Sequence, residues 1–280
     1  MLQIQDLKST AQLAYDEHAA SPPQILSELL HEAAFGEESP MGASFFSGDL
    51  ASLAISEVQS YRRDNFVPHN IVIATQGLPF EDVEGYAEKY LALASKGEAK
   101  AKKAASSTYT GGEARQKANL AGSTYTAVAF PVPSGVQAKP YHVLQKLLAS
   151  SNSFYAPYAS SGLWGFHATG APAEANAQVM AGVTALKGVV SGTGTGDIEH
   201  IKQALTVAST TALDSGDTAG VLLSASLAGV SPKEYTDYSK VSTADVVAAA
   251  KSSLAGVPTL ATLGKTAGAM NHATLTTLLK

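Results

Sequence analysis

The sequence predicts an α+β fold in which each unit has two layers, one of sheet and one of helices. Before residue 96 the pattern reads as helices, one strand and a helix, and after residue 108 as strands that alternate with helices. Helices outnumber strands in both parts. Hydrophobic residues make up 45% of the 280 residues and charged residues 15%, a composition typical of a globular chain with a buried core.

The first 95 residues are predicted to be mostly helical. Helical periodicity is broken at Ser21-Pro22-Pro23, a loop rich in Gly, Ser and Pro follows at 37–47, and another helix ends near Asn65-Phe66. The apolar, β-branched run Ile71–Thr75 predicts a strand that Gly77 and Pro79 end. Residues 80–95 are predicted to form a helix, with acidic residues early and lysines late, as the helix dipole favours.

Residues 96–108 are small, charged and typical of a linker between two units. Their four lysines leave a solvated connector or a polyanion-binding patch as alternatives, and the net charge of −5 favours the connector. The same charge gives no broad basic surface, so no nucleic acid partner is expected.

After the linker, strands and helices alternate. Strands are predicted over 123–132, 160–170 and 259–263, and helices over 141–149, 172–190, 197–214, 218–229, 231–234 and 243–254. The second of these strands contains the only tryptophan, Trp164, and its glycines are typical of a strand that a neighbouring backbone approaches closely.

The sequence predicts no catalytic, cofactor-binding or metal-binding residues. It has no cysteine, and its seven histidines (18, 31, 69, 142, 167, 200 and 272) form no H-x-x-E-H motif. His31-Glu32 and Glu199-His200 are adjacent pairs, which point apart on a helix. Exposed or hydrogen-bonded histidines are therefore expected, with a metal site built from distant histidines as the alternative.

Three further patterns imitate functional motifs. Leu263–Thr266 resembles the end of a phosphate-binding loop, but the required first glycine is replaced by Thr259. Gly192–Gly196 follows a helix and not a strand, so we interpret it as a turn. Ser160 or Ser161 with His167 would need residues on one strand to meet, and a packing role is the better interpretation.

No stretch of eighteen apolar residues predicts a membrane span. The N-terminus has no arginine before Arg62 and resembles neither a secretory signal nor a basic transit peptide.

Three ordered segments carry a resemblance to a known family. Tyr109–Glu113 with Arg115 follows the pattern Y-x-G-G-E-x-R, Ser161–Gly165 follows S-G-L-[FW]-G, and Leu260–Gly264 comes near the end. In this order they resemble the family of the mitochondrial processing peptidase and the complex III core proteins, which belongs to the pitrilysin/insulinase-type metallopeptidases.

The resemblance implies a domain organisation. Residues 1–95 would be the C-terminal part of a first peptidase-like domain, 96–108 the linker and 109–280 the second domain. The front of the first domain, with the zinc helix of active members, would be missing. Ser150–Pro157 contains no glycine where the substrate-binding subunit of the peptidase has a glycine-rich loop.

The resemblance therefore implies a non-catalytic core subunit of respiratory complex III, without a cofactor, peripheral to the mitochondrial inner membrane on the matrix side. Its implied partners are a core protein 1-like subunit, cytochrome b, the c-type cytochrome and the Rieske protein. The alternatives are a subunit of a processing peptidase and a family-derived scaffold of another mitochondrial complex. Because an incomplete first domain would expose apolar surface, we also hypothesise that a separate polypeptide completes it.

Overall fold

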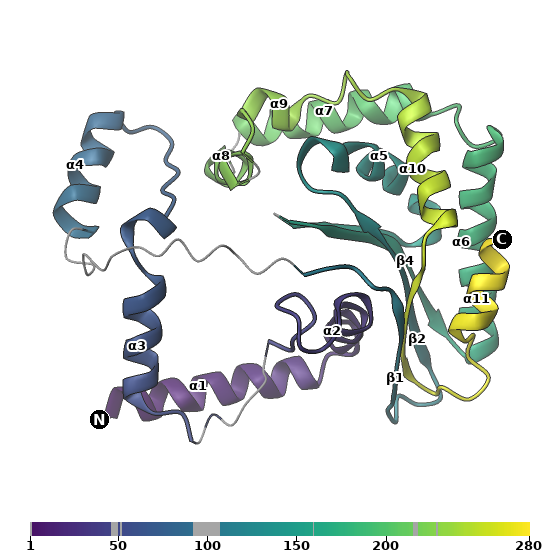
Figure 1. The fold of residues 1–280 in the computed structure, drawn as a ribbon, viewed down its shortest axis with the longest axis horizontal. Helices are drawn as coiled ribbons and strands as arrows, with labels where there is room; N and C mark the ends of the chain where they lie inside the picture. The colour runs from purple at the N-terminus through teal and green to yellow at the C-terminus, as the bar shows by residue number, and fades with distance from the viewer. Residues whose placement is uncertain are drawn as a thin grey trace.

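The computed structural model describes residues 2–45, 50, 52–91, 107–158, 160–214, 218–227 and 229–280. It contains helices and one mixed five-stranded sheet, which confirms the predicted α+β class (Figure 1). The strands are β1 (Gly112–Lys117), β2 (Thr124–Val132), β3 (Ser153–Pro157), β4 (Gly162–Gly170) and β5 (Thr259–Gly264).

The sheet has the strand order β1-β5-β2-β4-β3, so the last strand lies between the first two. β1 and β5 are parallel, and the other neighbours are antiparallel. β2 and β4 pair over their full lengths, from Thr124 opposite Gly170 to Val132 opposite Gly162. This central pair places the large side chains of both strands in the middle of the domain.

Three helices cover one face of the sheet: α5 (Lys139–Leu147), α6 (Pro172–Ser191) and α10 (Thr243–Ala255) (Figure 1). The core beneath them includes Phe130, Trp164 and Phe166, all of which are almost fully buried. The remaining helices after the linker are α7 (Ile198–Asp214), α8 (Thr218–Leu227), α9 (Pro232–Thr236) and α11 (His272–Leu279), with short 3-10 turns at Gly135–Ala138 and Ala149–Ser151.

A helix from before the linker covers the opposite face. This helix, α2 (Pro22–Phe35), packs its Leu26, Leu30 and Phe35 on the small side chains of the sheet, among them Ala127 and Ala129. The resulting second core joins the two parts of the chain. The sequence did not predict this third layer.

The other elements before the linker are α1 (Leu2–Ala19), α3 (Ile55–Asn65), a 3-10 turn at Pro68–Asn70, and α4 (Phe80–Leu91). In Figure 1, α3 and α4 lie apart from the sheet. Among the described residues from 52 to 91, only Val67 is buried.

Most predicted elements after the linker are confirmed, with end points that differ by a few residues. Pro172 occupies the first turn of α6, and the side chain of Ser231 caps α9 by accepting a hydrogen bond from the N–H of Glu234. Gly229 adopts φ +68°, and its N–H donates to the C=O of Ser226 in the last turn of α8, as a C-cap glycine does. The sequence did not predict β1, β3 or α11.

The prediction of a strand at Ile71–Thr75 was wrong, because these residues form no regular secondary structure. A strand needs a neighbour to pair with its N–H and C=O groups, and no other described segment pairs with this run. The end of the helix predicted over 80–95 and the linker at 96–106 lie outside the described residues, so the division into domains stays a prediction.

Both edges of the sheet are protected against further pairing. At the β3 edge, the side-chain amide of Gln145 donates to the C=O of Ser153 over 3.0 Å, and Pro157 has no N–H. At the other edge, β1 carries Glu113, Arg115 and Lys117. Charges and proline on edge strands oppose the addition of another strand.

We expect Gly165→Ala to lower the free energy of unfolding by at least about 2–3 kcal/mol, because added bulk in a tight core forces the backbone apart. A Cβ at Gly165 would lie 1.8 Å from the C=O oxygen of Val128. Urea denaturation measures the change. Gly196→Ala is the control, since a Cβ there meets open space, and equal stability of both variants would contradict the close packing of β2 and β4.

Candidate functional site

The segment Tyr109–Arg115 lies where α2, β1 and β5 meet. The hydroxyl of Tyr109 donates to the C=O of Val257 over 2.8 Å and accepts from the hydroxyl of Thr259 over 2.8 Å. Its ring packs edge-on against Phe35 of α2, with centroids 6.0 Å apart. Burial raises the pKa of Tyr109 to about 12, so the hydroxyl stays protonated and acts as a structural donor.

The next two residues cap the C-terminal end of α2. The N–H groups of Thr110 and Gly111 donate to the C=O of Ala34, over 2.8 and 3.3 Å. Gly111 adopts φ +66°, and a Cβ there would lie 2.8 Å from the side chain of Val257. Only glycine fits without strain, so this part of the motif is explained by the docking of α2.

Glu113 and Arg115 form an ion pair that holds the segment before α11. The guanidinium of Arg115 donates to the C=O groups of Thr266 and Met270, and the carboxylate of Glu113 accepts from the N–H of His272 over 3.3 Å. All the polar groups of the motif therefore serve to join segments that are distant in sequence.

The segment Ser161–Gly165 lies in the centre of the sheet, as its glycines and aromatic residues predict. The indole N–H of Trp164 donates to the hydroxyl of Ser253 on α10 over 3.0 Å, and both groups are buried. The ring of Phe166 lies 3.0 Å from the position of a Cβ at Gly182, which brings α6 close to the sheet. These residues pack the core, and they line neither of the two cavities described below.

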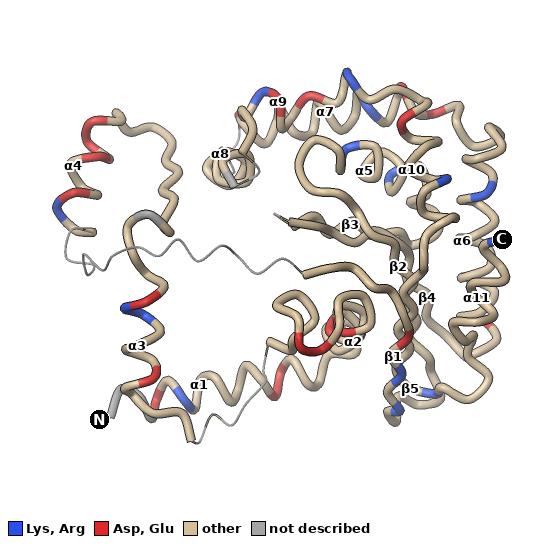
Figure 2. Tube along the Cα trace, in the orientation of Figure 1, with Lys and Arg blue, Asp and Glu red and all other residues tan. Residues whose placement is uncertain are grey.

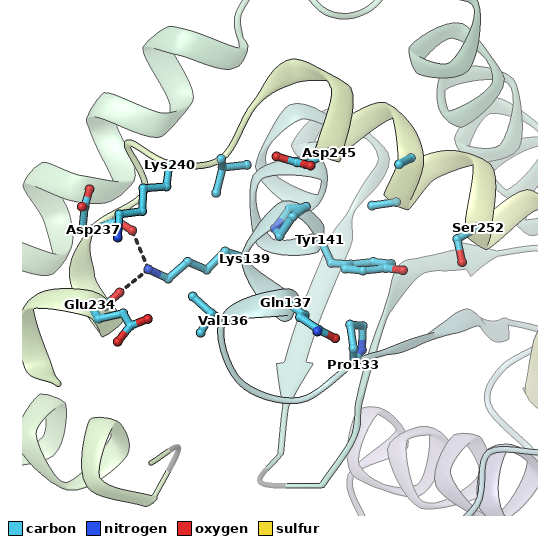
Figure 3. Close-up of a pocket in the computed structure, with 14 residues that line it drawn as sticks. Pro133, Val136, Gln137, Lys139, Tyr141, Glu234, Asp237, Lys240, Asp245 and Ser252 are labelled. Atoms are coloured by element: carbon cyan, nitrogen blue, oxygen red, sulfur yellow. Dashed lines mark hydrogen bonds between the residues drawn. The ribbon is translucent and has the colours of Figure 1, made fainter. Parts of the chain in front are cut away.

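A cavity of about 560 Å³ lies between the start of α5, the segment before α10, and α10 itself (Figure 3). Lys139 enters it from α5, and its ammonium donates to the C=O groups of Glu234 and Asp237 (Figure 3). The ammonium also lies 5.1 Å from the ring centroid of Tyr238. Burial lowers the pKa of Lys139, while the nearby Asp237 opposes that shift.

Two carboxylates around this cavity, those of Asp237 and Asp245, accept hydrogen bonds from neighbouring groups of the chain. Asp245 accepts from the N–H and the hydroxyl of Ser242, and Asp237 accepts from the N–H of Ser239 over 2.8 Å. Hydrogen bonds from Ser242 lower the pKa of Asp245. These bonds stabilise the segment between α9 and α10, and the ammonium of Lys139 joins that segment to α5.

A second cavity of about 510 Å³ adjoins the first and shares Val136, Lys139 and Glu234 with it. Its wall contains four tyrosines (155, 158, 235 and 238) and His142. Nδ1 of His142 lies 2.7 Å from the hydroxyl of Tyr238, and its ring stacks on Tyr155 with centroids 4.7 Å apart. Burial, helped by the charge of Lys146, lowers the pKa of His142 to about 4, so the imidazole is neutral at pH 7.

The structure does not join Ser160 or Ser161, just before β4, and His167 of β4 into a catalytic pair. Ser161 donates to the C=O of Val132 over 3.4 Å, and the hydroxyl of Ser160 contacts the sulfur of Met41. His167 stacks on Phe154 with centroids 4.5 Å apart. Burial lowers the pKa of His167. Each of the three side chains thus contacts a different part of the chain, and the packing role stays an interpretation.

The two glycine motifs are also structural. Gly192 ends α6 with φ +84°, and the N–H of Thr193 bonds to the C=O of Gly188, which confirms the predicted turn. Gly264 ends β5, and a Cβ there would lie 2.4 Å from the C=O of Ser123. The residues that follow it form a loop rather than the start of a helix, so no phosphate-binding loop is formed.

The described part of the chain does not provide a zinc site of the peptidase type. Within it, no group of three or more His, Asp or Glu residues is arranged to hold a metal ion. His31 bonds to Tyr158 and to the C=O of Ser27, both over 2.7 Å, and His272 lies 2.9 Å from the C=O of Pro258. None of the described helices is long and apolar enough to cross a membrane.

One protein-family model matches the middle of the chain. Residues 52–156, less than half of its length, match the model of the Peptidase M16 inactive domain. This match supports the M16 peptidase family. The matched part contains α3, α4, β1, β2, α5 and most of β3, and the matching domain is described as inactive. No curated protein matches the chain.

The sequence did not predict a role for Lys139 or Tyr238. Lys139 binds two C=O groups at the end of α9, and its ammonium lies over the ring of Tyr238 in the wall of the second cavity. Lys139 precedes a proline at the start of a helix, where a cation has no favourable interaction with the helix dipole. This unfavourable position was the one local indication that the lysine side chain binds another part of the chain. Its carbonyl partners are almost a hundred residues away, so nothing local could identify them.

The burial of His142 predicts a pH-dependent stability. The unfolded chain takes up a proton near pH 6.5 and the folded chain only near pH 4, so stability falls as the pH drops through this range. For His142→Phe, which preserves the stacking, we expect a fall that is smaller by about 2–3 kcal/mol. Urea denaturation at pH 7 and at pH 4.5 measures it, and an unchanged pH dependence would contradict the assignment.

Proposed function

We propose that this chain is a non-catalytic structural core subunit of mitochondrial respiratory complex III, ubiquinol–cytochrome c reductase, similar to its core protein 2. It scaffolds the assembly on the matrix side of the inner membrane. The match to an inactive peptidase domain supports a subunit that uses the peptidase fold without its chemistry. The family motifs support it further, since their polar groups bind other parts of the same chain.

The observation that carries the scaffold role is the uncovered surface of α3, residues 71–75 and α4. Phe80 is 73% exposed, Tyr61 65% and Tyr90 61%. Neither helix has a buried residue, although both lie within the part that matches the family. Large apolar side chains that remain exposed on successive elements are typical of a surface that another protein covers. In this proposal, partner subunits cover the surface.

The proposed partners are a core protein 1-like subunit, cytochrome b, the c-type cytochrome and the Rieske protein. Purification of the tagged chain in mild detergent tests this directly. We expect cytochrome b and the Rieske protein to copurify in amounts comparable to the chain. Copurification with a different mitochondrial complex, or with a peptidase subunit alone, would reject the complex III role.

We expect no proteolysis that depends on this chain. The chain with its copurified partner is incubated with a presequence peptide and zinc, and the partner alone and an EDTA-treated sample serve as controls. Because the described residues offer no metal-binding cluster, the cleavage rate should not rise when the chain is added. A zinc-dependent rise would favour the processing peptidase and contradict the scaffold.

A further inference from the structure

The run Ile71–Thr75 has the chemistry of a central β-strand and no partner. Ile71 has extended backbone angles, φ −109° and ψ 127°. Within the described part of the chain, the N–H of Ile71 bonds to the C=O of Pro68 over 3.2 Å, and the residues from Val72 to Thr75 make no main-chain hydrogen bond. Unpaired main-chain groups of an extended segment are a template for another strand.

The side chains of the run are apolar in both directions. Successive residues of an extended chain point to opposite sides, so Ile71 and Ile73 occupy one side and Val72 and Ala74 the other. Val72 is 46% exposed and Ile73 47% exposed. Strands that are apolar on both sides are typical of the interior of a sheet that is covered on both faces. The run therefore fits the inside of a larger sheet.

The two flanking helices also need a surface to pack on. α3 has 11 residues and α4 has 12, lengths at which an isolated helix is marginal in water. Ile55 and Val58 of α3 are 41% and 45% exposed, and Phe80 of α4 is more exposed still. A sheet that receives the run would also present an apolar face to these helices.

The charge of α4 indicates what kind of partner fits. Four of its residues are acidic (Glu81, Asp82, Glu84 and Glu88) and only Lys89 is basic, as Figure 2 shows. Two copies of the chain that met through α4 would bring these carboxylates together. Like charges at an interface oppose association, whereas lysines and arginines across it favour association. The surface of α4 thus favours a basic partner over α4 of a second copy.

We propose that the α3–α4 unit, residues 55–91, binds the edge strand of a β-sheet in another polypeptide. Residues 71–75 pair with that edge, α3 and α4 cover the apolar face of the joined sheet, and basic side chains of the partner lie opposite α4. This proposal rests on the proposed scaffold function, and it names the binding surface and the chemistry of the partner.

Cross-linking in the native assembly tests the pairing. The photoreactive residue p-benzoylphenylalanine is placed at Val72 in the full chain, and a matched control carries it at Val207 on α7, which is 64% exposed. We expect the first to cross-link to a strand of another polypeptide with lysines or arginines nearby. Cross-links only within the chain or to a second copy, or the same product from both positions, would overturn the proposal.

Hydrogen exchange provides a second measurement on the same assembly. The amide protons of residues 72–75 should exchange at least about a hundredfold more slowly in the assembly than in the chain alone, since pairing in a sheet protects them. The amides of β2 should be protected in both samples and serve as the internal reference. Equal exchange of residues 72–75 in both samples would show that no strand pairs with them.

A charge substitution separates this proposal from the function on which it rests. Because Ile73 is 47% exposed, Ile73→Lys should leave the thermal unfolding of the isolated chain unchanged. Its incorporation into the assembly should fall about tenfold or more, as expected when a charge is buried. Val207→Lys is the control.

Full incorporation of Ile73→Lys into complex III would overturn the pairing and leave the scaffold function intact. The reverse result, a cross-linked strand in a different complex, would support the pairing and reject the complex III role.

Discussion

The packing of α2 on the sheet is the interaction on which the rest of the structure depends. On this face the strands present alanines at 127, 129 and 261, all fully buried, and these small side chains let the helix approach closely. Leu26 and Leu30 fill the space between them. Without α2 this face would be open to water, so a segment from before the linker is part of the core after it. Tyr109, Thr110 and Gly111 fix its end.

This arrangement explains why recognisable motifs remain in a chain without the catalytic motif. The segment at Tyr109–Arg115 closes the end of α2 and holds the residues before α11, while Trp164 and Gly165 set the distance between strands and helices. Their residue types are dictated by packing and by main-chain hydrogen bonds. They are therefore retained by the fold itself, whatever chemistry the molecule performs.

The sequence predicted β2, β4 and β5 because their apolar side chains mark a buried strand locally. It could not predict β1 and β3, because edge strands carry charges, serine and proline that resemble a loop. The prediction of a strand at Ile71–Thr75 failed for the opposite reason. The residues have the pattern of a strand, but a strand forms only where another segment pairs with it. The contacts of Lys139 and the place of α2 are long-range in the same way, and local patterns do not encode them.

The protected edges of the sheet bear on the solubility of the chain. Gln145 and Pro157 at β3 and the charged residues of β1 make both edges of the sheet poor templates for another strand. The run from Ile71 to Thr75 has no such protection and combines high β propensity with no charge, the composition of segments that nucleate amyloid. Aggregation of the free chain would start there. If a cell synthesises the chain faster than the chain is assembled with its partners, chaperones or proteolysis would have to remove the excess.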